Sequence, residues 1–174
     1  MNNFTANLSR FFILILLQVF VFNYVQWFGF LNPVVYLLFL ILLPLEIPKS
    51  VQYILAFITG FMVDLFLKTY GIQAFACALM TFFRPYIILI LNGFKPLEAG
   101  IKPVPGVKDF AWILVYTFLL VFVQQLTVTI LEIFRWVEWW RIIWISAVNT
   151  LFTTFIILCI EYIFYAGKNK KSNH

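Results

Sequence analysis

The chain has 174 residues, of which 64% are hydrophobic and 11% charged, whereas soluble domains carry roughly 25% charged residues. Together with a mean hydropathy of +0.99, this excludes an ordinary soluble domain and predicts an integral membrane protein. The net charge of +5 comes from lysines and arginines near the ends and in one loop, which indicates membrane topology rather than nucleic-acid binding.

Apolar segments follow one another along the chain and predict a single all-α membrane domain with six transmembrane helices. The expected spans are about 11–28, 33–47, 49–67, 72–92, 110–134 and 142–165. A hydrophilic loop, 93–109, precedes the fifth span, and a basic tail, 166–174, follows the sixth. With both termini in the cytoplasm, most lysines and arginines fall on the cytoplasmic side, as the positive-inside rule requires.

The first two segments differ in character. Segment 11–28 is too long for the hydrophobic region of a typical signal peptide, and no small-x-small cleavage pattern follows it, so we expect a retained span. The second segment is short, and Pro44 and Pro48 bracket Glu46, so its helix should kink or stop there. A short span and a re-entrant hairpin both fit this pattern.

The third segment carries one carboxylate, Asp64, in an apolar helix, where an ionisable group costs roughly 2.5–3.5 kcal/mol on insertion scales. Gly60 lies one turn earlier on the same face, which suits another helix better than lipid. A turn ending at Gly71 leads into the next helix. Two pairs of small residues, Ala56 with Gly60 and Ala74 with Ala78, have the small-xxx-small spacing, which favours packing within the chain over dimerisation.

The fourth segment contains Arg84 followed by Pro85, which removes one helix hydrogen bond. Arg84 is the natural opposite charge for Asp64, and the turn makes their helices antiparallel neighbours. At 1.5 Å per residue, however, their depths differ by roughly 9 Å. A direct salt bridge would therefore need Arg84 to reach back, or a bend at Pro85.

The last two segments are mainly apolar, with Glu132 and Glu161 as their carboxylates. Between them, the turn 135–141 holds three tryptophans (Trp136, Trp139 and Trp140) and should lie at the membrane interface. The cysteines, Cys77 and Cys159, fall inside apolar segments and are expected to be buried, without a disulfide or a metal.

Most catalytic schemes lack their parts in this sequence. There is no His-Glu-x-x-His, Gly-x-Ser-x-Gly or P-loop pattern, and the single histidine is His174. The second aspartate, Asp109, lies in a loop and does not match a membrane aspartyl dyad. We therefore expect no enzyme, no metal and no cofactor. A solvent-facing cluster of Glu46, Asp64 and Arg84 would instead favour a membrane enzyme acting on lipid-linked substrates.

Residues 44–90 carry a resemblance to a known family. Pro44-Leu-Glu-Ile-Pro48, then Gly60-Phe-Met-Val-Asp64-Leu-Phe, then Gly71-Ile-Gln-Ala74-Phe-Ala76, resembles the rod-shape-determining protein MreD of bacteria. Arg84-Pro85-Tyr86 is similar to one branch of that family. The resemblance implies structural or partner-facing roles for six residues, namely Gly60, Asp64, Gly71, Ala74, Arg84 and Pro85.

The resemblance also implies a function. It suggests a non-enzymatic scaffold of the cell-elongation complex in the bacterial cytoplasmic membrane. Its partners would be an MreC-like bitopic protein, MreB-type filaments, and a peptidoglycan glycosyltransferase and transpeptidase. The family is similar in fold to the substrate-binding subunits (S-components) of energy-coupling-factor transporters, but fold does not fix function.

A vitamin-uptake subunit is therefore the main alternative function. Such a protein would bind a small molecule in a polar cavity, and partner ATPases would drive it. Its candidate polar residues lie on the sixth segment (Asn149, Thr150, Thr153 and Thr154), although the same residues can serve as hydrogen-bonding contacts between helices.

Overall fold

The structure is a computed structural model that describes residues 14–16, 18, 33–44, 47–94, 109–133 and 139–169, with side chains as far as Ile163. The main elements of this part are helices: α2 (Leu37–Ile41), α3 (Lys49–Leu67), α4 (Ile72–Leu91), α5 (Phe110–Ile133) and α6 (Trp139–Asn169). The expected all-helical class is confirmed.

The described residues contain four helices long and apolar enough to cross a membrane, rather than six. These are α3, α4, α5 and the part of α6 from Trp139 to Ile163. The bounds of α3, α4 and α5 lie close to those expected for the third, fourth and fifth spans. The expected first span, 11–28, falls mostly outside the described residues, as do Glu46, most of the loop 93–109 and the end of the tail.

The second expected span, 33–47, forms only a short helix in its described part. Its helix, α2, is only five residues long, and Val35, Leu37 and Ile41 are at most 1% exposed. Most of α2 is apolar and buried, with Phe39 partly exposed, which is typical of a core element rather than of a surface facing lipid. Pro44 and Pro48 disfavour continuation of the helix.

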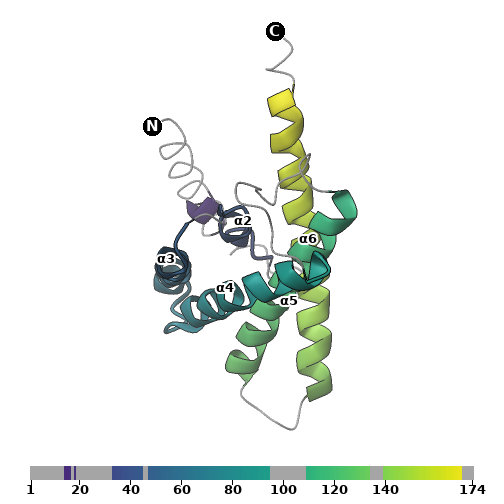
Figure 1. Cartoon of the computed structure of the whole chain (residues 1–174). Helices are drawn as coiled ribbons and strands as arrows, with labels where there is room; N and C mark the ends of the chain where they lie inside the picture. Colours follow the sequence, from purple (N-terminus) through teal and green to yellow (C-terminus); the bar gives the residue numbers. More distant parts are fainter. Residues whose placement is uncertain are drawn as a thin grey trace.

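The longer helices pack in sequence order around α2. α3 packs on α4, α4 on α5, and α5 on α6, while α2 also contacts α5. Figure 1 shows α3 and α4 on one side of the molecule, α6 running across the direction of α4 on the other, and α2 between α3 and α6. The α2 segment therefore fills the interior that the longer helices enclose.

α3 lies at the edge of this arrangement and has two distinct faces. Ala56, Gly60 and Val63 are buried against the rest of the protein, whereas Phe57 and Leu65 are more than half exposed. Small residues on the inner face allow α4 to approach closely. The outer face is apolar and suits lipid or another membrane helix.

The expected interfacial turn 135–141 is shorter than the sequence suggested. α6 begins at Trp139, so Trp139, Trp140 and Arg141 belong to its first helical turn, while 134–138 lies outside the described residues. Trp140 is nevertheless 82% exposed, as an interfacial anchor requires. The other end of α6 extends into the expected basic tail.

Candidate functional site at the α3–α4 junction and the Arg84 cluster

Asp64, on α3, caps the N-terminus of α4. Its carboxylate accepts hydrogen bonds from the backbone N–H groups of Gln73 at 3.0 Å and Ala74 at 2.9 Å, and from the Thr69 hydroxyl. The first N–H groups of a helix have no partner within it, and the helix dipole favours a negative charge there. Asp64 is only 4% exposed, so its charge is balanced by these donors rather than by water.

The turn between the helices makes this contact possible. α3 ends at Leu67 and is capped by Lys68, whose backbone is left-handed with φ of 57° and whose N–H donates to the Asp64 carbonyl. Gly71 has φ of 94°, a conformation that glycine adopts without steric cost, and it precedes the first residue of α4. The turn thus brings the first N–H groups of α4 beside the last turn of α3.

Gly60 is required by the close approach of the two helices. A Cβ atom at this position would lie 2.5 Å from Ala74 Cα and 2.5 Å from the Gln73 carbonyl oxygen. Both atoms are backbone atoms that cannot move aside independently. Four of the residues singled out in the sequence, Gly60, Asp64, Gly71 and Ala74, therefore meet in one structure, which we call the α3–α4 junction.

Arg84 lies in the second half of α4 and is only 1% exposed. Its Nη2 group donates to the carbonyl oxygens of Ile41, at 3.1 Å, and Leu43, so it binds carbonyls at the end of α2 and just beyond it. A cation is favourable at these groups because a helix leaves its final carbonyls without partners.

Arg84 also joins two longer helices. Its Nε donates to the Tyr116 hydroxyl on α5 at 2.8 Å, and its Nη1 to Gln52 Oε1 on α3 at 3.3 Å. These residues, with Ile41 and Leu43, form what we call the Arg84 cluster. A planar guanidinium with five N–H groups can serve several acceptors at once, which a lysine ammonium could not do in this geometry.

Asp64 and Arg84 do not pair. The hydrogen bonds of Asp64 go to the start of α4, and those of Arg84 go to α2, α3 and α5. α4 continues through Pro85 to Leu91, so no bend brings the guanidinium back to the carboxylate. Pro85 itself is exposed, beside a small pocket that Arg84 also lines.

A second buried polar network was not foreseen. Gln73 Oε1 accepts from the Tyr36 hydroxyl at 2.8 Å and from Gln124 Nε2 at 2.9 Å, and the Cys77 thiol donates to the Tyr36 oxygen at 3.6 Å. The network links the segment before α2 with α4 and α5. Its signal in the sequence was glutamine inside mainly apolar spans, Gln73 in the fourth and Gln124 and Gln125 in the fifth, since such residues need a buried partner.

The polar residues of α6 mainly serve helix packing. Thr153 Oγ1 accepts from the Val34 N–H at 3.3 Å, and the Thr150 hydroxyl donates to the Ser146 carbonyl at 2.7 Å. The Thr154 hydroxyl and both carboxylate oxygens of Glu161 are buried, and no hydrogen-bond partner for them occurs in the described structure.

No group of three His, Cys, Asp or Glu side chains within the described ranges could hold a metal ion. Asp64 and Arg84 are buried and separate, so they do not form the solvent-facing cluster that would favour an enzyme; Glu46 lies outside the described residues. Cys77 is buried as expected, but Cys159 is exposed, and both are free thiols.

Comparison with protein-family models, with curated proteins and with solved structures finds no match to this chain.

Proposed function

We propose that the chain is a non-enzymatic membrane component of the bacterial cell-elongation complex, of the MreD type. One observation supports this above the others: Gly60, Asp64, Gly71 and Ala74, which carry the resemblance, meet in a single junction. Each residue type has a geometric reason there, namely a missing Cβ, a capping carboxylate, a positive φ and a small contact residue. The four residues of the motif thus form one structural unit, which makes a chance sequence match a poorer explanation.

In this role the junction acts by holding α3 and α4 in a fixed antiparallel pair. Asp64 faces inward and its oxygens accept three hydrogen bonds, so it is not itself a surface for a partner. Contact with an MreC-like protein or with peptidoglycan synthases would fall to the exposed outer face of α3, which includes Ile54, Phe57, Phe61 and Leu65. Loosening the junction would then weaken the complex indirectly.

The polar interior also supports a scaffold rather than an enzyme. Arg84, Asp64 and Gln73 all use their polar atoms for contacts between elements of this chain. Side chains committed in this way fix a shape and are not free to act on a substrate. We place the protein in the cytoplasmic membrane with both termini in the cytoplasm, following the distribution of lysine and arginine.

Affinity purification of the tagged chain from its native membrane in a mild detergent, followed by mass spectrometry, tests the proposal. We expect recovery of an MreC-like bitopic protein together with a peptidoglycan glycosyltransferase and transpeptidase. Asp64→Asn should lower that recovery, whereas Asp109→Asn, which removes the same charge from an exposed site, should not. Recovery of paired ATPases and a coupling subunit would contradict the proposal.

That last result would favour the vitamin-uptake alternative. One observation on α6 keeps it open: the buried hydroxyls of Ser146 and Thr154 and the carboxylate of Glu161 have no hydrogen-bond partner within the described part of the chain. Buried polar groups without partners are unusual and can mark a ligand that is absent. Radiolabelled vitamin uptake by cells that carry or lack the chain separates the two functions.

A further inference from the structure

A small pocket lies between the first turn of α3 and the second half of α4. Its volume is about 90 Å³, and it is lined by Lys49, Gln52, Tyr53, Thr81, Arg84 and Pro85. A single water needs roughly 10–15 Å³ measured in the same way, so the pocket admits a group several times larger than one water. It is separate from the α3–α4 junction, which lies at the opposite end of α3.

The charged side chains that line the pocket are both cationic. Lys49 is exposed, and its ammonium has no hydrogen-bond or ion-pair partner in the described structure; the same is true of the Tyr53 hydroxyl. Arg84 is buried at the inner wall, and its contacts occupy four of its five N–H groups. The pocket therefore holds two positive charges and unused donors.

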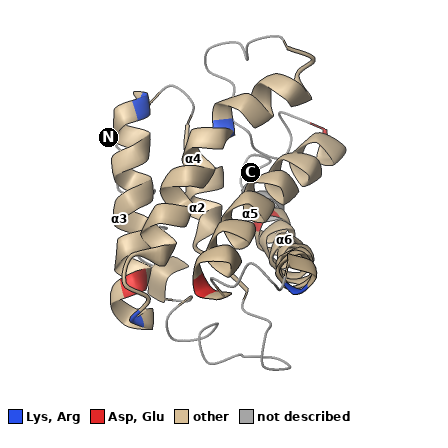
Figure 2. Ribbon diagram, turned by 90° about the horizontal axis from the view of Figure 1, so that it is seen from below, with Lys and Arg blue, Asp and Glu red and all other residues tan. Residues whose placement is uncertain are grey.

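The carboxylate on α3 does not neutralise these charges. Asp64 lies near the other end of the helix and already caps α4. Figure 2 shows basic residues at one end of the α3–α4 pair, and an acidic and a basic segment side by side at the far end of α3. Like charges gathered in a recess create a local field that favours an anion.

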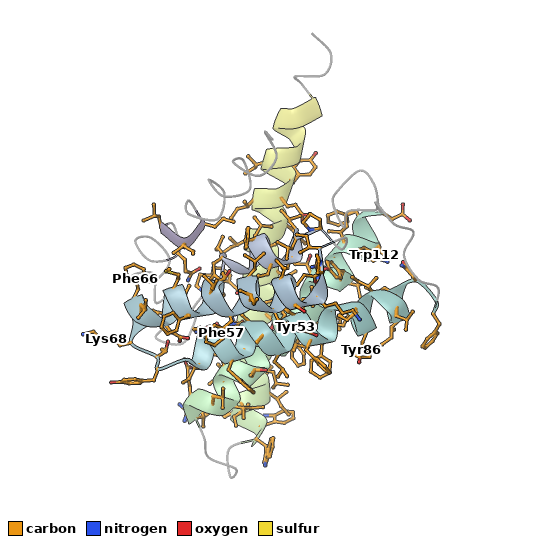
Figure 3. The ribbon with its side chains drawn as sticks, turned by 60° about the vertical axis from the view of Figure 1, so that its left-hand side comes forward. Tyr53, Phe57, Phe66, Lys68, Tyr86 and Trp112 are labelled. Carbon is orange, nitrogen blue, oxygen red and sulfur yellow. The ribbon has the colours of Figure 1, made fainter. Side chains whose placement is uncertain are left out.

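The surface around the pocket is apolar and aromatic. Lys49, Tyr53 and Phe57 are spaced four residues apart and share one face of α3, and Phe57 stacks on Phe61 with ring centroids 6.0 Å apart. On α4, Tyr86 follows Pro85 and is 53% exposed. Tyr53, Phe57 and Tyr86 lie on the face of the pair that Figure 3 brings forward. Apolar and aromatic side chains around the pocket can pack against a hydrocarbon chain, but they do not interact favourably with a free anion.

We propose that this pocket binds the phosphate headgroup of an anionic phospholipid, with its acyl chains along the aromatic face of α3. Lys49 and the remaining N–H of Arg84 would contact the phosphate oxygens, and the Tyr53 hydroxyl would donate a further hydrogen bond. Tyrosine suits this depth because its ring is apolar and its hydroxyl polar. The site does not rest on the elongation role, but its acyl chains would cover Phe57 and Phe61, which the proposed elongation partner would also contact.

Native mass spectrometry of the full chain in detergent tests the site. The protein is titrated with phosphatidylglycerol and, separately, with phosphatidylcholine, which carries the same phosphate but no net charge. We expect Lys49→Gln to weaken phosphatidylglycerol binding about fivefold, the effect of one basic residue at an anionic surface. Lys68→Gln is the matched control, because it removes an exposed lysine from the other end of the same helix. Tyr53→Phe, which keeps the ring, should weaken binding less.

Three outcomes would overturn the proposal. Equal binding of the two lipids by the unaltered chain would mean a non-selective lipid coat. Equal effects of Lys49→Gln and Lys68→Gln would mean a general charge effect rather than a site. Displacement of phosphatidylglycerol by millimolar inorganic phosphate would mean that the pocket takes a free anion and makes no use of the acyl chains. Because neither lysine has a buried contact, misfolding does not complicate the comparison.

Discussion

Asp64→Asn should destabilise the fold although it removes a buried charge from a membrane helix. The amide keeps one oxygen but replaces the other with an NH2 group. In the orientation that keeps the bonds to Thr69 and Gln73, this NH2 faces the Ala74 N–H, which is now 2.9 Å from a carboxylate oxygen. Two donors then face each other, and the buried Ala74 N–H loses its partner.

The size of the effect follows from three contributions. Leaving a buried donor without a partner costs about 1–3 kcal/mol. Losing the negative charge at the start of α4 removes roughly 0.3–1 kcal/mol more. The opposing contribution is the relieved desolvation of the carboxylate, which is reduced here because Asp64 lies in the last turn of α3 and accepts three hydrogen bonds. We therefore expect a net loss of about 1–3 kcal/mol in the free energy of unfolding.

Equilibrium unfolding of the purified chain in mixed micelles with increasing SDS, followed by tryptophan fluorescence, measures this loss. Asp109→Asn is the control, because Asp109 is exposed immediately before α5 and asparagine caps a helix nearly as well as aspartate. The reasoning about the junction would be refuted if Asp64→Asn left stability unchanged or raised it, because desolvation would then outweigh the cap.

Three further predictions concern other buried positions and use the same unfolding measurement. Gly60→Ala should cost at least about 1–3 kcal/mol, because its Cβ would meet the backbone of α4 at 2.5 Å; an unchanged midpoint would show that the helices separate freely. Arg84→Lys should cost at least about 2 kcal/mol despite keeping the charge, because an ammonium cannot reach α2, α3 and α5 together; stability equal to the parent would contradict the bridging role. Glu161→Gln should leave stability unchanged or raise it by about 1 kcal/mol, since the carboxylate is buried without a hydrogen-bond partner in the described structure; a clear loss would reveal one elsewhere.

The helices that could be predicted well are those whose ends carry a local signal. Pro48 sets the start of α3, and the turn ending at Gly71 sets its end and the start of α4. Long apolar runs then leave few alternatives for α5 and α6. The interfacial turn before α6 was overestimated, because tryptophans that prefer the membrane interface fit a helical first turn as well as a loop.

The burial of α2 could not be predicted, because a short apolar run has the same sequence pattern in a membrane span, a core helix or a re-entrant hairpin. The position of this segment depends on contacts that are distant in the sequence. Arg84, about forty residues later in the chain, binds the carbonyls of Ile41 and Leu43. The hydrogen-bond donors of Asp64 were not predicted for a related reason. Arg84 was considered as a partner because of its charge, although the difference in depth opposed a direct pair; a buried carboxylate is satisfied equally by N–H donors, and the turn at 68–71 places those nearby.

The two buried charges also differ in when they can be satisfied during synthesis. All side-chain hydrogen-bond partners of Asp64 lie between Thr69 and Ala74, so its carboxylate can be hydrogen-bonded as soon as the start of α4 has been made. The carbonyls of Ile41 and Leu43 are synthesised before Arg84, so of its hydrogen-bond partners only Tyr116 is synthesised later. The segment from α2 to α4 can therefore enter the translocon with the Asp64 carboxylate and most N–H groups of Arg84 already hydrogen-bonded, and α5 and α6 then assemble onto it.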